Sequence, residues 1–439
     1  MYIEQFSREF SEMFDSNEIK KFDVVVAGAG VAGCCAAIAA ARTGKNVLLI
    51  EQTSGPGGVA VHCGCPVFIG FGCYDKQIVG GLGEEFLRQL DSMNAIAQVS
   101  ASKRIATTLA DKKELNGVYT TTEPDIALCL NRMISAAGVS RLYYTTITDV
   151  VKNGRKITGL KLFCNGRRFE VACSAVVDAT GDAVVSLLAG AEVIEGSPEE
   201  TMTKTVLFKV NNVRDFDKVR FKARFTELQN SDSFPFHGQD VFMGNQLGTS
   251  DEVLLNMSLV AGDALDPWDL TRMDVELREQ VMPIIDWLRR NFDEFKDCRL
   301  AAIAPKIGVR GGRTAVTEEM ITCQSLIDGV PVAEPIALAH RTFGGHGINK
   351  FRNDWDKHIE GCRGVPYGAL KVSGFDNLLV AGRAIGVEPK ALSSIRLMPI
   401  CMATGQAAGI SAALCVDNGG FAPYAQVKNE LLRQQAILD

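Results

Sequence analysis

Apolar residues in the first fifty positions come in two unbroken runs, separated by glycines and a stretch of small residues. The runs at residues 24–27 and 47–50 have the length and composition of strands buried on both faces of a sheet. Between them, residues 28–33 read Gly-Ala-Gly-Val-Ala-Gly, and small apolar residues follow over one helix length. This order predicts a βαβ unit with two parallel strands and a closely packed helix.

The pattern after this unit predicts a loop and then helices. Residues 54–66 are rich in glycine and proline and predict a loop. The glycine cluster at 80–83 opens a predicted helix over 84–93, and a second helix is predicted over 125–137. Residues 142–150 then predict a further strand of the same sheet.

Short β patterns with hairpin turns come next. The turns are predicted at Asn153-Gly154 and Asn165-Gly166, which are typical two-residue hairpin connections. The β patterns that they separate cover residues 148–151, 156–163 and 168–178. This spacing predicts a β-meander.

The character of the chain changes over residues 196–365, where strand and helix patterns mix with more aromatic and charged residues. No second glycine fingerprint occurs there, so an inserted domain is predicted. The apolar strand signal returns at 375–383 and precedes the uncharged stretch 397–416. This stretch contains Pro399, Gly405 and Gly409, which favour a helix packed inside a protein over a membrane span.

Composition narrows the class of protein. The 439 residues are 46% hydrophobic and 22% charged, which is typical of a globular chain, and the net charge of −6 without basic runs makes nucleic acid an unexpected partner. The first 23 residues lack an apolar core, so no secretory signal is predicted, and residues 1–19 are expected to form an arm. Thirteen scattered cysteines favour free thiols in a reducing cytoplasm.

The glycines of the first turn predict a dinucleotide site. Gly28 permits the tight turn, Gly30 lets the backbone approach a pyrophosphate, and Gly33 lets the helix pack on the sheet. Phosphates would then bind free N–H groups at the positive end of the helix. Glu51 lies 18 residues after Gly33, where its carboxylate can accept hydrogen bonds from ribose hydroxyls and would repel a 2′-phosphate. An adenine dinucleotide is therefore expected, and NADP is disfavoured.

The order of strand, glycine loop, β-meander and a strand ending in Ala-Thr-Gly favours a flavoprotein over an NAD dehydrogenase. The chain resembles the FAD-dependent oxidoreductase family of the glutathione-reductase-like flavoprotein superfamily, which includes the fumarate reductase and succinate dehydrogenase flavoproteins. The resemblance rests on DVVVAGAGVAG with LLIEQ, GGVAV, VVDATGDAVVSLLAGA, and NLLVAGRAIG followed by SSIRLMPICMATGQAAG. It spans both ends of the chain and implies FAD as the cofactor, without a substrate.

The resemblance implies a role for each matching position. The three glycines of the first turn would hold the pyrophosphate and Glu51 the adenosine ribose. At the last helix, the N–H groups of Leu397 and Met398 would point at the N1 and O2 edge of the flavin and stabilise its negative charge on reduction. The other implied cofactor contacts are Gly58 and Val59 on the flavin side, Thr180 and Gly181 at the adenine end, Gly382 and Arg383 over the pyrophosphate, and Val31, Ala32, Gln52, Ile147, Ala179 and Arg396.

The segment His62-Cys63-Gly64-Cys65 departs from the small, unreactive residues of the family's loop. With Cys73, which is also expected near the flavin ring, these residues leave several interpretations open. Cys63 and Cys65 could form a redox disulfide that exchanges electrons with the flavin, and His62 or a cysteine could bind FAD covalently. The four together could ligate a metal, but they lack the paired CxxC spacing of a zinc site, and no metal is expected. The plainer interpretation is that the thiols are inert packing residues beside the ring.

Arginines and histidines supply the remaining candidate chemistry. Arg396 and Arg310 follow stretches of small residues, and a guanidinium near the flavin can bind a substrate carboxylate bidentately. His340 or His346 could exchange the proton that accompanies hydride transfer. The plainer interpretations are an ion pair, on the surface or on the pyrophosphate side, for the arginines and a solvated loop for the histidines. Arg313 and Arg341 are further members of this group.

Together these patterns predict a doubly wound α/β Rossmann-like FAD domain with a β-meander, formed by residues 20–195 and 366–439, and an inserted α/β substrate domain over 196–365. The expected function is hydride transfer between flavin N5 and a small, anionic metabolite, with a second electron donor or acceptor that the sequence does not identify. A homodimer is compatible with the sequence. The alternatives are a thiol–disulfide redox flavoprotein using Cys63 and Cys65, and an FAD-binding subunit of a larger redox complex.

Overall fold

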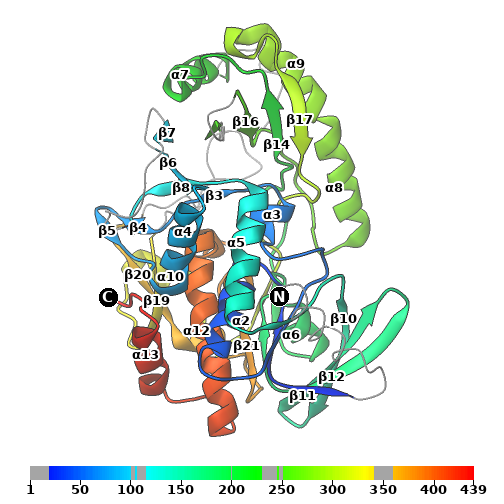
Figure 1. Cartoon of the computed structure of the whole chain (residues 1–439), viewed down its shortest axis with the longest axis vertical. Coiled ribbons are helices and arrows are strands. Elements are labelled where there is room, and N and C mark those ends of the chain that lie inside the picture. The colour runs from blue at the N-terminus through cyan, green and yellow to red at the C-terminus, as the bar shows by residue number, and fades with distance from the viewer. Residues whose placement is uncertain are drawn as a thin grey trace, which may run out of the picture.

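The predicted apolar strands assemble into a seven-stranded sheet in the computed structural model of the protein (Figure 1). The structure describes residues 19–99, 104–105, 115–198, 200–229, 245–246, 251–340 and 359–439. The central strand β1 pairs in parallel with β2 on one side and with β12 on the other. The strands are β1 (Lys20–Ala27), β2 (Val47–Ile50), β9 (Ser140–Leu142), β10 (Thr146–Asn153), β11 (Lys156–Cys164), β12 (Arg167–Asp178) and β21 (Leu378–Val380).

The predicted β-meander is formed by β10, β11 and β12, which pair antiparallel in sequence order. Asn165 and Gly166 both have positive φ, at 46° and 81°, as a type I′ hairpin turn requires. β12 is long enough for three neighbours: its first half pairs with β11, and its last residues run parallel to β1 and β21. The predicted fold class, a doubly wound Rossmann-like α/β domain with a meander and an inserted cap, is confirmed.

Helices of the body pack on this sheet and on one another. The helix after the glycine turn, α2 (Val31–Ala41), contacts β1, β2 and the long helix α12 (Met398–Asn418). The helices predicted over 84–93 and 125–137 are present as α4 (Gly81–Ser92) and α5 (Glu123–Ala136). The other body helices are α3 (Val59–His62), α6 (Val184–Leu188), α10 (Cys323–Asp328), α11 (Leu392–Ile395) and α13 (Tyr424–Arg433).

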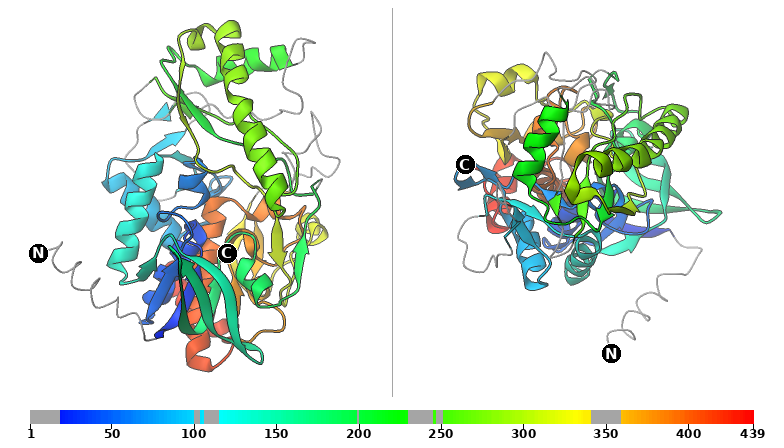
Figure 2. Two further views of the ribbon diagram at one scale, coloured as in Figure 1. Left: turned by 90° about the vertical axis from the view of Figure 1, so that its right-hand side faces the viewer. Right: turned by 90° about the horizontal axis from the view of Figure 1, so that it is seen from above.

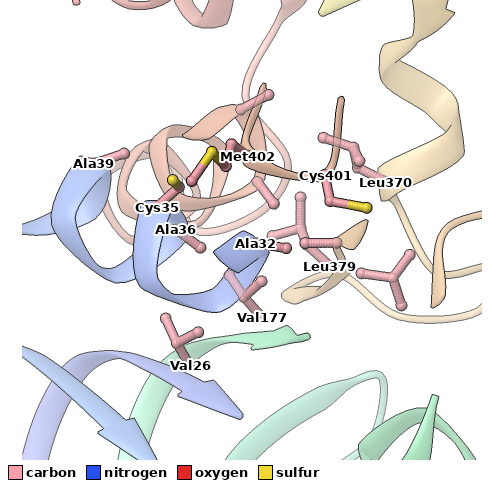
Figure 3. Close-up of a cluster of buried hydrophobic side chains, with 14 of the residues drawn as sticks. Val26, Ala32, Cys35, Ala36, Ala39, Val177, Leu370, Leu379, Cys401 and Met402 are labelled. Atoms are coloured by element: carbon pink, nitrogen blue, oxygen red, sulfur yellow. The ribbon is translucent and has the colours of Figure 1, made fainter. Parts of the chain in front are cut away.

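Small residues let α2 and α12 pack with their backbones in close contact (Figure 3). A Cβ atom added at Gly405 would lie 2.1 Å from the carbonyl oxygen of Ala32, and one added at Gly409 would lie 2.0 Å from that of Ala36. Neither position can accept a side chain without moving one helix. Residues 397–416 carry no charged side chain, and most of this stretch is buried within the body.

α12 is also the one helix in the described part of the chain that is long and apolar enough to cross a bilayer. Of its most apolar window, 83% is buried inside the protein. Such burial is what the sequence predicted from the glycines and proline of this segment.

A four-stranded antiparallel sheet belongs to a cap. The cap lies above the body in Figure 1 and in the left view of Figure 2. Its strand order is β15-β16-β14-β17, and its buried residues form a separate apolar core with helices α7, α8 and α9. The cap elements are β14 (Phe208–Asn211), β15 (Asn245–Gln246), β16 (Val253–Leu255), β17 (Arg299–Ile303), α7 (Lys218–Gln229), α8 (Pro267–Glu279), α9 (Val281–Asn291) and the 3₁₀ turn Asp293–Phe295.

Short strands and turns complete the structure. Buried residues of the segment from β18 (Arg313–Ala315) to β20 (Arg363–Pro366) pack with the larger core of the body, although the sequence assigned this segment to the inserted domain. The predicted domain boundaries stay predictions. The remaining elements are β3 (Val67–Phe68), β4 (Gly72–Cys73), β5 (Lys76–Gln77), β6 (Ala97–Val99), β7 (Arg104–Ile105), β8 (Val118–Thr120), β13 (Val193–Glu195), β18 (Arg313–Ala315), β19 (Pro335–Ala339), β20 (Arg363–Pro366) and the 3₁₀ turns Tyr367–Leu370 and Gly382–Ala384.

The loop predicted over residues 54–66 and the predicted N-terminal arm are two local expectations from the sequence. The predicted loop 54–66 contains one helical turn, α3, which begins directly after Gly58. Gly58 has a φ of +50° and supplies the backbone bend that the periodicity of the sequence does not reveal. The predicted N-terminal arm lies almost entirely outside the described residues.

Candidate active site

A cavity of about 840 Å³ lies between the carboxyl ends of the parallel strands and the cap. In a doubly wound sheet this edge is where ligands bind. Every predicted cofactor contact except Gly33 lies in its lining: Gly28, Gly30, Val31, Ala32, Glu51, Gln52, Gly58, Val59, Ile147, Ala179, Thr180, Gly181, Gly382, Arg383, Arg396, Leu397 and Met398. The cavity therefore brings together segments from both ends of the chain.

The turn between β1 and α2 leaves room for a ligand at the helix N-terminus. Gly28 has a φ of +94°, and a Cβ atom there would lie 2.6 Å from the carbonyl oxygen of Ala179. A Cβ atom at Gly30 would meet no atom within 4 Å, and no side chain caps the first turn of α2. The first N–H groups of α2 thus face open space, which fits a pyrophosphate at the positive helix end.

Gly33 has the packing role that the sequence suggested, and it lies behind the cavity. A Cβ atom at this position would lie 1.8 Å from the carbonyl oxygen of Gly28. Any side chain at Gly33 would therefore push α2 away from the turn.

Glu51 follows β2 and reaches back to the glycine turn. Its buried carboxylate accepts hydrogen bonds from the backbone N–H of Ala29 at 2.8 Å and from the N–H and hydroxyl of Thr53 at 2.9 and 2.8 Å. A carboxylate can accept about four hydrogen bonds, so about one acceptor position remains for a ribose hydroxyl.

The Ala-Thr-Gly loop after β12 is organised by the buried carboxylate of Asp178. It accepts hydrogen bonds from the hydroxyls of Thr180 and Ser186, while burial raises the pKa of its carboxyl. Beside this loop, Arg383 forms an ion pair with Asp182 at 2.9 Å. These contacts hold Thr180, Gly181 and Arg383 on the cavity wall.

The histidine of the loop, His62, lines the cavity, but its ring is engaged within the body. Its Nε2 atom lies 2.9 Å from the Thr53 hydroxyl and 3.0 Å from the carbonyl oxygen of Gly55. This places Nε2 next to the residue that bonds Glu51, on the side of the predicted ribose contact. Covalent attachment of FAD to His62 stays a prediction, and the hydrogen bonds of Nε2 do not favour it.

Cys63 and Cys65 are separate free thiols in the structure, so the alternative of a disulfide between them is not supported. Cys63 donates to the carbonyl oxygen of Ile307 at 3.2 Å, and burial raises the pKa of its thiol to about 11 despite the nearby charge of Lys306. Burial also raises the pKa of Cys65. A thiol that stays protonated is a poor nucleophile and a poor partner for disulfide exchange.

A metal site at this loop also lacks structural support. Within the described ranges, no group of three or more His, Cys, Asp or Glu side chains is arranged to hold a metal ion. Cys73 lies outside the cavity lining, on the short hairpin β4–β5.

Arg310 and Arg396 both lie on the cavity wall. Arg310 is buried, with 8% of its surface exposed, and its guanidinium donates to the carbonyl oxygen of Thr203 and, at 3.5 Å, to Asn256 Oδ1. Arg396 follows α11, and one of its nitrogens lies 3.6 Å from the sulfur of Met202. The chain thus brings together two cations that are 86 residues apart in sequence.

The other candidates from the sequence lie elsewhere. The ring of His340 contacts Tyr74, its Nδ1 atom lies 2.8 Å from the carbonyl oxygen of Gly361, and it is not in the cavity lining. Arg313 pairs with Glu195 at 2.8 Å and is also absent from the lining. His346 and Arg341 lie outside the described residues. An acid–base role for His340 therefore has no support from its position.

Sequence reasoning missed several polar residues of the cavity, among them Thr53, Thr205, Asn256 and Lys306. Thr205 and Asn256 come from different cap segments, and the Thr205 hydroxyl donates to Asn256 Oδ1 at 2.7 Å. Lys306 lies on the segment that leads to Arg310. The sequence held a signal for Asn256, because Asn256 and Ser258 are the two polar residues in the otherwise apolar run 253–260. Nothing local distinguishes Thr205 or Lys306.

Comparisons with known proteins agree with this geometry. A family model described as FAD dependent oxidoreductase matches residues 23–435. The chain is 27% identical over 170 residues to digeranylgeranylglycerophospholipid reductase 1 of Methanococcoides burtonii, a match that spans 37% of this chain and 38% of that protein. The fold of this chain is similar to that of a geranylgeranyl bacteriochlorophyll reductase-like protein from Thermoplasma acidophilum, with a TM-score of 0.51 and 15% identity. The match covers 96% of this chain and 85% of that protein.

These findings carry different conclusions. The similarity to the Thermoplasma protein concerns the fold alone, given its low identity. The family model, in contrast, covers the glycine turn, the Ala-Thr-Gly loop and the last helix, the three segments that form the open dinucleotide cradle. The cradle fits FAD because its glycines leave space at a helix N-terminus and its acid is held beside them. The chain belongs to the FAD dependent oxidoreductase family, and FAD is its cofactor.

Proposed function

We propose that the protein transfers a hydride between flavin N5 and a small, anionic metabolite bound on the cap side of the cavity. The observation that carries this proposal is the position of Arg310, a buried cation on the cavity wall. The guanidinium of Arg310 is held by hydrogen bonds to Thr203 and Asn256 and keeps its positive charge on the cavity wall, so it is suited to bind negative charge on a ligand there.

The division of labour in this proposal follows from the residues present. Bound FAD supplies the redox chemistry at N5. Arg310 binds a carboxylate or another anionic group of the substrate, and Asn256 and Thr203 fix the orientation of the guanidinium. Arg396 adds a second positive charge to the wall and favours the same ligand.

The chain also prepares the site for charge that develops during reduction. Leu397 is the N-cap of α12, and no side chain caps this helix. The positive helix end therefore stabilises negative charge on a ligand placed there. Val67, Leu207 and Val309 supply apolar wall, which excludes water from the reacting region.

The test is anaerobic mixing of the FAD-loaded protein with panels of small carboxylic acids and other anionic metabolites, followed by the visible flavin absorbance. A substrate is identified by bleaching of the oxidised flavin, or by its return when reduced protein meets an acceptor. Arg310→Gln should then raise the apparent KM or Kd about tenfold or more, in the range for a lost charged hydrogen bond. Arg220→Gln is the matched control, because Arg220 is an exposed cap arginine paired with Glu294. Equal kinetics for Arg310→Gln and the parent protein would contradict the proposal.

A second candidate is reduction of an apolar, isoprenoid-type substrate. It is favoured by the apolar part of the cavity wall and by the partial similarity to the Methanococcoides reductase. The same bleaching assay, run in reverse with reduced protein and short isoprenoid alcohols, separates the two. Reoxidation by these compounds and not by anionic acceptors would favour the second candidate.

Several expectations from the sequence stay predictions. They are a role as the FAD-binding subunit of a larger redox complex, a second electron donor or acceptor, the relation to the fumarate reductase flavoproteins, a cytoplasmic location and a homodimer.

A further inference from the structure

The ring of His62 is joined by hydrogen bonds to the acid predicted to hold the adenosine ribose. The connection begins at Nε2, which lies 2.9 Å from Thr53 Oγ1 and 3.0 Å from the carbonyl oxygen of Gly55. Thr53 in turn donates to Glu51 from both its hydroxyl and its backbone N–H, at 2.8 and 2.9 Å. His62, Thr53 and Glu51 all line the cofactor cavity.

The neighbours of Nε2 determine where its proton lies. A carbonyl oxygen can only accept, so the contact with Gly55 requires a proton on Nε2. The one hydroxyl proton of Thr53 is directed to Glu51 Oε1 at 2.8 Å, which leaves the Thr53 oxygen to accept from the same N–H. Nε2 thus donates to Thr53 and Gly55 together, and Thr53 donates to the carboxylate.

The other side of His62 is fixed to the cap. Its backbone carbonyl accepts a hydrogen bond from the N–H of Lys306 at 2.9 Å, and the next residue, Cys63, donates to Ile307. The α3 turn therefore cannot shift freely, and the imidazole is a fixed donor. At the far end, Glu51 Oε2 is held by the N–H of Ala29, so the carboxylate has a defined orientation beside the glycine turn.

We infer that His62 is a positioning residue for the cofactor: through Thr53 it orients the Glu51 carboxylate for the adenosine ribose of FAD. The inference rests on the predicted contact between Glu51 and the ribose, and it assigns His62 no part in hydride transfer. A histidine with only a structural role would stabilise the loop without favouring ligands that carry ribose hydroxyls.

The experiment measures binding of ADP and of 2′,3′-dideoxy-ADP to the 439-residue apoprotein by isothermal titration calorimetry. His62→Phe removes the donor and keeps a ring of similar size, whereas His62→Gln keeps an N–H donor. We expect His62→Phe to weaken ADP binding about three- to tenfold, the effect of one lost hydrogen bond. His62→Gln should stay within about twofold of the parent protein. Binding of dideoxy-ADP should be the same in all three, because it lacks the hydroxyls that Glu51 would hold.

Two results would overturn the inference. One is unchanged ADP binding by His62→Phe, and the other is an equal loss for ADP and its dideoxy analogue. Thr53→Val gives an independent route that leaves the histidine in place. In the double variant His62→Phe/Thr53→Val, the loss of ADP affinity should be no larger than in Thr53→Val alone, whereas multiplicative losses would show that the two residues act separately.

Glu51→Gln separates this inference from the assumptions beneath it. If Glu51→Gln binds ADP as well as the parent protein does, the predicted ribose contact is wrong and the inference falls with it. Failure of the proposed hydride transfer has a different signature, because it leaves the ADP titrations unaffected and appears only in the flavin bleaching assay.

Discussion

The thiol of Cys63 donates a hydrogen bond to the backbone carbonyl of Ile307, 244 residues away, at 3.2 Å. This contact ties the loop after the cofactor glycines to the cap segment that carries Lys306 and Arg310. It gives the cysteine a tethering role in place of the redox role suggested by its spacing to Cys65.

Alkylation should reveal the protonated state of Cys63. Burial raises its pKa to about 11, so at pH 8 only about one thiol in a thousand is ionised. We expect Cys63 to react with maleimide far more slowly than the partly exposed Cys164, and to react faster as pH rises toward 11. Peptide mass spectrometry after timed labelling measures both rates. Rapid labelling of Cys63 at pH 8 would show that the thiol is not buried as the structure has it.

The contact between α2 and α12 should tolerate no added methyl group. Gly405→Ala places a Cβ atom 2.1 Å from the backbone of Ala32, so we expect a loss of about 1–3 kcal/mol or more in the free energy of unfolding. Gly55→Ala is the matched control, because a Cβ atom there meets nothing within 4 Å. Thermal or urea unfolding of both variants checks this. Similar stabilities for the two would contradict the packing of the helices.

Lys209 of β14 and Glu123 of α5 join the cap to the body through an ion pair of 2.6 Å, with side chains only 14% and 17% exposed. Lys209→Met leaves this carboxylate without its close partner, and we expect a loss of about 1.5–3 kcal/mol in stability. The double variant Lys209→Met/Glu123→Leu should recover part of the loss, since it removes both charges. Chemical denaturation of the parent protein, the single variants Lys209→Met and Glu123→Leu, and the double variant gives the coupling energy. Strictly additive losses would exclude the interaction.

Lys204 predicts a stability change at alkaline pH. It is fully buried and donates to Thr201 Oγ1 and to the carbonyl oxygen of Gly262, and burial lowers its pKa to about 8. In the unfolded chain the pKa is about 10.4, so between these values the unfolded state binds the extra proton and the folded state does not. Stability should therefore rise with pH across this window.

The size of the effect and its control follow from the same shift. Relative to Lys204→Met, which has no titrating group at this position, the parent protein should gain about 2–3 kcal/mol between pH 8 and 10.4. Urea unfolding at a series of pH values measures the difference. A difference that is flat with pH would mean that Lys204 keeps its ordinary pKa when the protein is folded.

The sequence by itself determined the parts of this protein that depend on neighbours along the chain. The βαβ unit at residues 22–51 was predictable because apolar runs, glycines and small residues each impose a local conformation. The meander was predictable because Asn165-Gly166 adopts the positive φ angles that a tight hairpin needs. The glycine turn and the acid of the cofactor cradle followed from the same local rules, since both lie within one supersecondary unit.

Only the tertiary structure decided what the loop after Gly58 does. The ring of His62 bonds Thr53, and the thiol of Cys63 bonds Ile307, and both partners are fixed by how the loop folds against other segments. The pKa of a thiol depends on burial, which comes from residues far away in sequence. For the same reason Arg310, Asn256 and Thr205 meet on one wall only because three separate cap segments converge there. The spacing of residues along the chain does not predict which side chains lie close together in space. The backbone conformation of each helix, strand or turn, in contrast, depends on residues that are close in sequence.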